Sequence, residues 1–117
     1  MSPQASSHSA ATRRRHAPVF AALGHETRLQ LVSRLAAGEA CSITQLCERT
    51  RLSRQAVTKH LLVLEHAGLV RGERRGRENR YTYQPGGVAE LGAYLDAISR
   101  QWDEALGRLK AFVEGSP

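Results

Sequence analysis

The fold of this chain is decided by residues 42–83, which read SITQLCERTRLSRQAVTKHLLVLEHAGLVRGERRGRENRYTY. Ser42 and Gln45 have the Ser-x-x-Gln spacing of a capping box, which predicts a short helix over residues 43–49. Ser53 offers a second N-cap, and Ala67-Gly68 marks the end of the helix that follows. One buried stripe runs along this second helix, formed by Val57, Leu61 and Leu64. Two helices joined by a tight turn are therefore expected.

A hairpin is predicted directly after the second helix. Residues 69–74 and 79–83 are short β-prone segments on either side of a polar tip, residues 75–78. Tyr81 and Tyr83 alternate with polar residues, so we expect their rings to cover the core. Five arginines gather in residues 71–80, namely Arg71, Arg74, Arg75, Arg77 and Arg80. A basic hairpin beside a helix-turn-helix is typical of a winged helix, whose wing holds phosphates or enters the minor groove of DNA.

The residues before this region predict two more helices and a tail. The first helix covers about residues 16–23, with Val19, Phe20 and Leu23 at helical spacing. The second covers residues 26–37, and its expected buried face is Leu29, Val32, Leu35 and Ala36. Residues 1–15 lack apolar periodicity and end in three arginines, so we expect a disordered, solvated basic tail whose arginines are open to phosphate. The DNA-binding domain is assigned to residues 16–85.

Residues 86–117 are expected to form a dimerisation helix that runs from Val88 to about Glu114. Apolar residues recur there in unbroken steps of three and four: Val88, Leu91, Leu95, Ile98, Trp102, Ala105, Leu109 and Phe112. This heptad pattern indicates packing along another helix. At ~1.5 Å per residue the helix is roughly 40 Å long, more than one small domain covers, so part of it is expected to contact a second copy. The alternative is a helix that lies across its own domain.

The outer face of the helix after Ser53 carries the candidate base-reading residues. Gln55 and Lys59 lie opposite the buried stripe on a helical wheel, and Arg54 and Thr58 flank them. Arginine can bridge two acceptors on guanine and glutamine two edge atoms of adenine, whereas lysine and threonine suit bases or phosphates. A helix-turn-helix inserts the first turns of its second helix into the major groove. The pattern therefore predicts a DNA reader.

Charge divides the chain into a basic and an acidic part. Residues 1–85 hold 14 Lys and Arg against 6 Asp and Glu, while residues 86–117 hold 3 against 5. The basic part is expected to face a polyanion, with solubility alone as the alternative. No Ser-His-Asp, paired-acid or phosphate-loop pattern occurs, so neither an enzyme nor a cofactor is predicted. No apolar stretch is long enough for a signal or membrane span, which predicts a cytoplasmic protein with reduced thiols.

Several separated motifs resemble one family. Residues 42–46 (SITQL), 52–61 (LSRQAVTKHL) and 64–70 (LEHAGLV) closely resemble the ArsR family of bacterial winged-helix repressors, and residues 22–29 (ALGHETRL) resemble the entry to that family's second helix. The resemblance covers about Phe20 to Tyr83. It implies a homodimer with the first and last helices at the interface. It also implies a palindromic DNA operator that is released when an inducer arrives.

The expected sensor departs from the metal-responsive members of that family. They carry Cys-x-Cys at the start of the third helix, where this chain has Ser42 and Thr44, which bind soft metals poorly. A second family site needs histidine in the last helix, and residues 86–117 contain none. We therefore predict no metal site; His8 and His16 are the alternative ligands that the N-terminal segment offers. His60, at the margin of the buried stripe, is interpreted as a hydrogen-bonded boundary residue.

A thiol switch is the other sensing hypothesis. Cys41 and Cys47 lie about 9 Å apart along the short helix, beyond the ~7 Å reach between Cα atoms for a disulfide. A bond between them would need refolding. Cys47 is interpreted as a small buried hydrophobe, and the role of Cys41 stays open.

We predict a mainly α protein with a small β-hairpin, a homodimeric winged helix-turn-helix repressor of double-stranded DNA whose long C-terminal helix lies at the interface. The candidate DNA-binding residues are Ser53, Arg54, Gln55, Thr58, Lys59, Arg74, Arg75, Arg77 and Arg80. The candidate interface residues are Phe20, Val88, Leu91, Leu95, Ile98, Trp102, Leu109 and Phe112. The alternatives are a sequence-indifferent architectural DNA binder and a winged helix that docks proteins. The operator, any inducer, and repression as against activation do not follow from the sequence.

Overall fold

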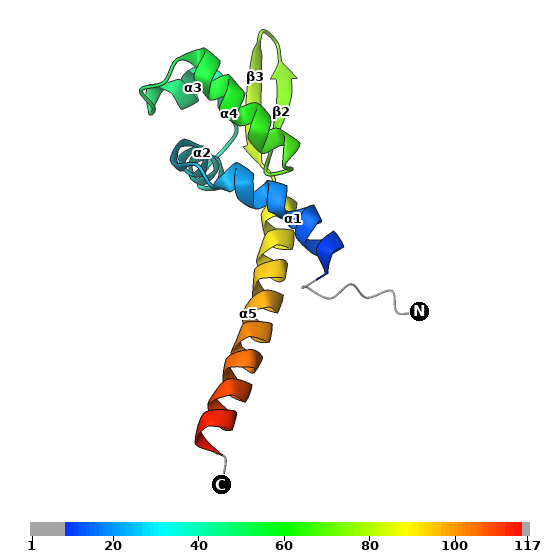
Figure 1. The fold of residues 1–117 in the computed structure, drawn as a ribbon. Coiled ribbons are helices and arrows are strands. Elements are labelled where there is room, and N and C mark those ends of the chain that lie inside the picture. The colour runs from blue at the N-terminus through cyan, green and yellow to red at the C-terminus, as the bar shows by residue number, and fades with distance from the viewer. Residues whose placement is uncertain (1–8, 116–117) are drawn as a thin grey trace.

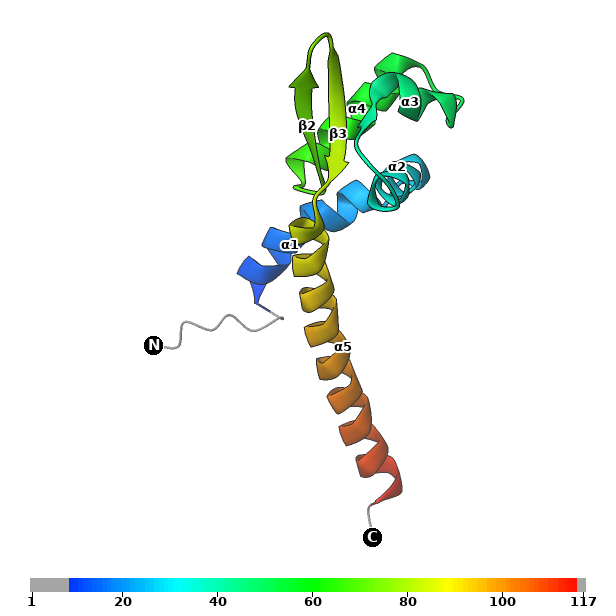
Figure 2. The ribbon, with the colours of Figure 1, turned by 180° about the vertical axis from the view of Figure 1, so that it is seen from behind.

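A computed structural model describes residues 9–115 of the protein. The elements are α1 (Ala10–Leu23), α2 (Glu26–Ala36), β1 (Cys41–Ser42), α3 (Ile43–Glu48), α4 (Arg54–His66), β2 (Val70–Arg75), β3 (Glu78–Tyr83) and α5 (Pro85–Glu114). Figure 1 shows α2, α3, α4 and the β2–β3 hairpin gathered at one end, with α1 crossing the start of α5. The opposite view in Figure 2 shows the far half of α5 projecting away from these elements. The predicted mainly α fold with a small hairpin is confirmed.

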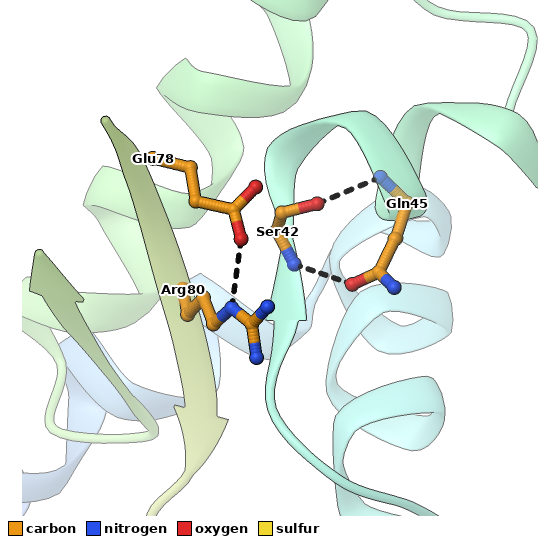
Figure 3. A network of polar contacts seen from close by, with 4 residues as sticks. All are labelled: Ser42, Gln45, Glu78 and Arg80. Carbon is orange, nitrogen blue, oxygen red and sulfur yellow. Dashed lines mark hydrogen bonds and ion pairs between the residues drawn. The ribbon is translucent and has the colours of Figure 1, made fainter. Parts of the chain in front are cut away.

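The two helix starts of the helix-turn-helix form as predicted. The Ser42 hydroxyl accepts from the backbone N–H of Gln45 at 3.2 Å, and the Gln45 side-chain oxygen accepts from the backbone N–H of Ser42 at 2.9 Å. Figure 3 shows this reciprocal pair, which completes the capping box of α3. The Ser53 hydroxyl caps α4 by accepting from the backbone N–H of Ala56 at 3.1 Å. Both helices therefore begin at the residues expected from local sequence.

The end of α4 turns the chain directly into the wing. Gly68 has a φ of 78°, a left-handed conformation that glycine adopts at no steric cost. The N–H of Gly68 bonds to the carbonyl of Glu65, and the N–H of Leu69 bonds to the carbonyl of Leu64. These two bonds form a Schellman ending, which satisfies carbonyls that the helix leaves open.

The sheet has the strand order β1-β3-β2 and is antiparallel. Only Gly76 and Arg77 connect β2 with β3, so the predicted four-residue tip is a two-residue turn. Gly76 has a φ of 61° and Arg77 has no positive φ, which fits a type II′ turn with glycine first. Strand β1, which pairs with Tyr81 and Arg80 of β3, was not predicted. Two residues are too short to show the alternation that identifies a strand.

The core lies where α2, α3 and α4 meet the sheet. Its most deeply buried side chains are Leu31, Leu35, Leu46, Val57, Leu61, Leu64, Leu69 and Val70. The predicted stripe of α4 is thus confirmed, and Tyr81 and Tyr83 cover the core as expected. The predicted face of α2 is wrong in part, because Leu29 is 49% exposed and Ala36 is also exposed. Leu31 points inward instead. Because each residue of a helix turns by about 100°, Leu29, two positions earlier, lies on the opposite side.

Helix α1 begins at Ala10, not at His16. The Ser9 hydroxyl caps it by accepting from the backbone N–H of Thr12 at 3.0 Å. Residues 9–15, predicted as part of a disordered tail, instead form the cap and the first turns of α1, and residues 1–8 lie outside the described part of the chain. Alanine and arginine both favour helix, so this segment needs little periodicity once it is capped.

Contacts with α5 hold the early turns of α1. Arg15 forms an ion pair with Glu90 at 2.8 Å, and the His16 ring stacks on Tyr94 with ring centres 4.3 Å apart. Both partners are more than 70 residues further along the chain. Local sequence could not reveal this support.

Helix α5 begins at Pro85, earlier than the predicted Val88, because proline suits the first position of a helix. Val88 packs against the core and Leu91 is buried, so these two predicted interface residues are already covered by their own chain. The molecule measures 71 × 35 × 21 Å, with a radius of gyration of 19.2 Å. A compact chain of this length has a radius of about 13 Å. The excess reflects the projecting part of α5, where Gly92 and Gly107 have no close neighbour within the described residues.

The start of α5 meets the end of α4 at Gly87. A methyl group added at Gly87 would collide with the carbonyl oxygen of Gly68, whereas one added at Gly86 would meet nothing within 4 Å. The Gly68 backbone is held by the Schellman bonds and cannot move aside freely. Gly87 therefore sets how closely α5 approaches the end of α4.

We expect Gly87→Ala to lower the free energy of unfolding by about 1–3 kcal/mol, because the added methyl must displace backbone. Gly86→Ala is the matched control: it fills open space, and alanine favours helix by about 0.5–1 kcal/mol over glycine. Urea denaturation of both variants at one protein concentration measures the difference. Equal midpoints for the two variants would contradict the close approach.

Candidate nucleic-acid interface

Helix α4 presents a polar face away from the core. Its inner stripe is 0% exposed, so the side chains opposite that stripe must face outward. Arg54, Gln55 and Lys59 are exposed, and Thr58 is half-buried beside them. Ser53 is exposed as well; its oxygen caps the helix, and its O–H can still donate to a ligand. The structure thus brings the predicted residues of α4 onto one accessible face.

The guanidinium of Arg54 is held by a partner from the preceding helix. Its Nη1 donates to Oγ1 of Thr44, in the first turn of α3, at 2.6 Å. The hydroxyl of Thr58 donates to the backbone carbonyl of Arg54 at 2.7 Å, which turns that hydroxyl back toward the helix. Sequence reasoning considered Thr44 only as an altered metal position. This hydrogen bond depends on how α3 and α4 cross, so it could not be predicted from neighbouring residues in the sequence.

One face of the wing has paired charges. Opposite residues of a hairpin share a face, and the register sets Arg75 against Glu78 and Glu73 against Arg80. Arg80 also donates from Nε to a carboxylate oxygen of Glu78 at 2.8 Å, as Figure 3 shows. Both of these side chains remain about half exposed, at 46% and 47%. Of the predicted wing residues, Arg80 therefore has its charge compensated within the hairpin.

Most of the uncompensated charge of the wing lies near its tip, although Arg71, at the start of β2, is exposed and has no described ion pair either. Arg74, Arg75 and Arg77 are exposed, and none of them forms an ion pair with another described residue. Arg74 donates from Nε to the carbonyl of Gly76 at 3.2 Å, which braces the turn. Three cations therefore stand close together at the end of the hairpin, where Figure 1 shows the wing projecting beyond the helices.

The wing is fixed to α4 through Gly72. Its backbone N–H donates to the carboxylate of Glu65, on α4, at 3.1 Å. The Tyr81 ring lies so close that a Cβ on Gly72 would stand 2.8 Å from it. Burial raises the pKa of the Tyr81 phenol above its usual value, and the nearby Glu65 carboxylate adds to the rise. The wing and α4 are therefore one packed unit.

Two histidines join the start of α2 to the middle of α4. Nδ1 of His25 accepts from the backbone N–H of Thr27 at 3.1 Å and so caps α2. The His25 ring contacts His60 with ring centres 4.6 Å apart. Burial lowers the pKa of His60, and the charges of His25 and Arg28 lower it further. His60 is thus half-buried at the margin of the stripe, as expected, but its partner is another imidazole ring.

The cysteines are both free thiols. Cys41 is buried, with its sulfur 3.5 Å from the carbonyl oxygen of Glu39, and Cys47 is half-buried against the core. Within residues 9–115, no group of three or more His, Cys, Asp or Glu side chains is placed to hold a metal ion. His16, an alternative ligand, stacks on Tyr94, and His8 lies outside the described residues.

An apolar surface runs along α5. A hollow of about 510 Å³ lies along α5 and is lined by Phe20 of α1 and by Tyr94, Leu95, Asp96, Ile98, Ser99 and Trp102 of α5. Beyond it, Trp102 is 63% exposed and Phe112 is 77% exposed, and Leu106 and Val113 widen the exposed strip. The helix is not a membrane span: across residues 9–115, no helix is both long enough and apolar enough for that. Large exposed apolar residues that follow one helix in this way are typical of a protein contact surface.

The sequence is similar to a helix-turn-helix family and to individual transcriptional regulators. A family model for a helix-turn-helix domain matches residues 23–73. The HTH-type transcriptional regulator Rv2034 of Mycobacterium tuberculosis is 39% identical over 85 residues, covering 73% of this chain and 76% of that protein. The HTH-type transcriptional repressor SmtB of the same species is 31% identical over 85 residues, but the match spans only 61% of its length.

Solved structures have the same fold. An ArsR-like transcriptional regulator from Rhodococcus sp. RHA1 superposes with a TM-score of 0.84 and 34% identity, covering 93% of this chain and 99% of that one. The homodimeric winged helix-turn-helix DNA-binding domain of Mb0332 from Mycobacterium bovis has a TM-score of 0.64 and 27% identity, covering 86% and 92%. The fold is that of a winged helix-turn-helix regulator. The chain belongs to the ArsR family, which consists of transcriptional regulators and not of enzymes.

The lowered pKa of His60 predicts a loss of stability in acid. The unfolded chain takes up the proton near the ordinary pKa of about 6.5, whereas the folded chain resists it. The free energy of unfolding should therefore fall as the pH drops below about 6.5 toward the folded pKa, and be unaffected by His60 above that window. His60→Gln should flatten this dependence, while His66→Gln, an exposed change on the same helix, should not. Thermal unfolding from pH 5 to 8 measures it; identical pH profiles for both variants would contradict the assignment.

Proposed function

We propose that the chain is a sequence-specific, DNA-binding transcriptional repressor that acts in the cytoplasm. It binds a palindromic operator in double-stranded DNA as a homodimer, without regulation by metal. The observation that carries this proposal is the outward face of α4, where Arg54 and Gln55 are exposed and the Arg54 guanidinium is held in place by Thr44.

The reading mechanism follows from that face. Insertion of the first two turns of α4 into the major groove brings Arg54 and Gln55 to base edges, where Arg selects guanine and Gln selects adenine. Thr44 acts as a positioning residue, because its bond restricts the directions that the Arg54 side chain can take. The Thr58 hydroxyl is committed to the helix backbone, so its methyl group is the part that suits a thymine methyl. Lys59 and the hydroxyl of Ser53 suit phosphates.

The wing supplies affinity more than specificity. Arg74, Arg75 and Arg77 bind backbone phosphates or the minor groove beside the site read by α4. Arg80 contributes less than the sequence suggested, since Glu78 neutralises it. The bond between Glu65 and Gly72 keeps the wing at a fixed distance from α4, so both contact one duplex together.

The homodimer is supported by the exposed apolar strip of α5 and the hollow beside Phe20. Water contact along this strip is unfavourable by about 25 cal/mol per Å² of apolar surface, which a second copy of the same helix would remove. Mb0332, the M. bovis neighbour, is described as homodimeric. In a two-fold dimer the α4 helices face half-sites about 34–36 Å apart, or a small multiple of that distance.

The absence of metal regulation is supported by the bonds of Ser42 and Thr44. Both hydroxyls are already used, Ser42 in the capping box and Thr44 in the contact with Arg54. Hydroxyls are also poor ligands for soft metals. A cation at the start of α3 would have to break these bonds.

The second candidate function is an architectural binder without sequence preference. The three unpaired arginines of the wing tip favour it, because phosphate contacts alone give non-specific affinity. Such a protein gains little from a positioned Arg54. A protein-docking winged helix is the weaker alternative, because the exposed positive charge of α4 and the wing suits a polyanion such as DNA.

We expect wild-type protein to sediment as a dimer at micromolar concentration. Trp102→Ala should weaken the dimer by on the order of 3 kcal/mol, because it removes a large aromatic from the contact. Ile98→Glu should dissociate it by placing a charge in the strip. The exposed Arg108→Ala on the same helix is the control. A monomeric wild-type protein would refute the proposed dimer.

The operator can be found by footprinting the DNA upstream of the protein's own gene. Base reading is then tested by comparing binding to this operator with binding to random DNA of equal length. Arg54→Ala or Gln55→Ala should cost roughly 1–3 kcal/mol on the operator and little on random DNA. Thr44→Val, which removes only the hydroxyl, should act in the same direction with a smaller loss. Arg75→Ala or Arg77→Ala should weaken both DNAs about equally and flatten the salt dependence. Equal losses on both DNAs for Arg54→Ala and Gln55→Ala would leave the architectural function.

Zinc, cadmium and arsenite should each leave operator affinity unchanged, because hydroxyl residues, Ser42 and Thr44, occupy the two positions where metal-responsive members carry cysteines. Fluorescence anisotropy with labelled operator and a titration of each metal measures this. Ser42→Cys combined with Thr44→Cys provides a comparison that restores thiols at both positions. A loss of about tenfold or more in the wild-type protein with one metal would show a site that these residues do not explain.

A further inference from the structure

A small pocket lies between α2 and α3, away from the outer face of α4. Its volume is about 180 Å³, and its lining residues are Gln30, Leu31, Arg34, Leu46, Arg49 and Thr50. We call it the α2–α3 pocket. Two cationic residues line it beside two leucines: Arg34 in the last turn of α2 and Arg49, the C-cap of α3.

The lining is divided into an apolar floor and a donor-rich rim. Leu31 and Leu46 are each 1% exposed and form the floor. Arg34, which is half-buried, and Arg49, which is exposed, form the charged part of the lining, and the guanidinium group that each carries only donates hydrogen bonds. No carboxylate lines the pocket. The rim therefore has an excess of positive charge and of hydrogen-bond donors.

Arg34 has a donor that the protein leaves unused. Its Nε is buried and has no hydrogen-bond partner among the described residues, and neither described ion pair includes it. The negative end of the α2 dipole favours a cation at this position, but it gives Nε no acceptor. Buried charged donors are normally paired, because leaving one unpaired is costly. Nε itself is too enclosed for a ligand to reach, but the Arg34 guanidinium keeps an uncompensated positive charge beside the pocket, and that charge favours an anion there.

We propose that the α2–α3 pocket binds a short aliphatic carboxylate. The carboxylate oxygens face Arg34 and Arg49, and the hydrocarbon lies on Leu31 and Leu46. A volume of 180 Å³ corresponds to about six water molecules at ~30 Å³ each, which matches an acid of about four carbons. Inorganic phosphate satisfies the arginines but leaves the apolar floor uncovered, so it is the poorer fit.

The pocket shares residues with the helix-turn-helix. Arg49 is the C-cap of α3, and the Thr50 hydroxyl lies 3.5 Å from the carbonyl of Cys47 in the turn that leads to Ser53. A ligand held there links α2 to this turn and so changes how freely α4 can settle on DNA. This second step rests on the proposed function. By linkage, a ligand that alters operator affinity has its own affinity altered equally by the operator.

The binding step is tested on the full chain without DNA. Calorimetric titration with butanoate should give saturable binding with a dissociation constant of about 1 mM or lower. Butanamide, the neutral analogue, should bind at least about tenfold more weakly, because it lacks the charge that pairs with guanidinium. Tighter binding of inorganic phosphate than of butanoate would overturn the assignment to an organic carboxylate.

Variants assign the binding to this pocket. Arg34→Met should weaken butanoate binding about tenfold or more. Arg49→Met should also weaken it, and because Arg49 is exposed this change leaves the core intact. The second variant therefore still tests the site if Arg34→Met does not fold. Arg100→Met on α5 is the matched control and should bind as wild type does. Unchanged binding in both Arg34→Met and Arg49→Met would overturn the site.

The link to DNA has a separate readout. Operator affinity should change when butanoate is added to wild-type protein and stay constant in Arg34→Met. Butanoate binding without any change in operator affinity would overturn the link while leaving the pocket. Failure of the proposed function would show differently, as equal binding of operator and random DNA with no ligand present.

Discussion

Burial of the inner stripe of α4 is the interaction on which the rest of the structure depends. Val57, Leu61 and Leu64 are completely buried, and burying each contributes about 1.5–3 kcal/mol relative to exposure. This burial fixes the rotation of α4 about its axis. A roll of the helix would expose the stripe and bury Arg54 or Lys59, which is more costly still. The polar face is therefore presented outward with little freedom, as a surface that reads base edges must be.

Features that depend on neighbours in sequence could be predicted, and features that depend on distant contacts could not. The capping box at Ser42, the N-cap at Ser53 and the glycine ending at Gly68 are local, and the sequence predicted all three. Strand β1 exists only because β3 lies beside it, and the first turns of α1 gain support from α5. The site follows the same rule. The face of α4 could be predicted from periodicity, whereas the hold of Thr44 on Arg54 needs the crossing of two helices.

The number of arginines in the wing overstated how much positive charge it has available for DNA. Four of the five arginines within residues 71–80 were predicted to contact DNA, but the register places Glu73 and Glu78 opposite two of these four, Arg80 and Arg75. The ion pair with Glu78 compensates the charge of Arg80, so most of the net positive charge lies near the tip of the hairpin. Since exposed ion pairs contribute little to stability, this pairing matters more for where the positive potential lies than for how well the hairpin folds.

The joint between Gly68 and Gly87 links the two halves of the molecule. Gly68 ends α4 in a left-handed conformation, and its carbonyl lies against the backbone of Gly87 at the start of α5. In the proposed dimer, α5 lies near the two-fold axis and α4 on the DNA, so this joint sets the angle between them. A small rotation at the joint becomes a larger displacement of α4, because α4 extends away from the joint. The absence of a side chain at Gly87 lets its backbone lie against the Gly68 carbonyl, while Gly68 is needed for its left-handed conformation. In the proposed dimer, the spacing of the two α4 faces is therefore determined in part by two glycines that lie away from those faces.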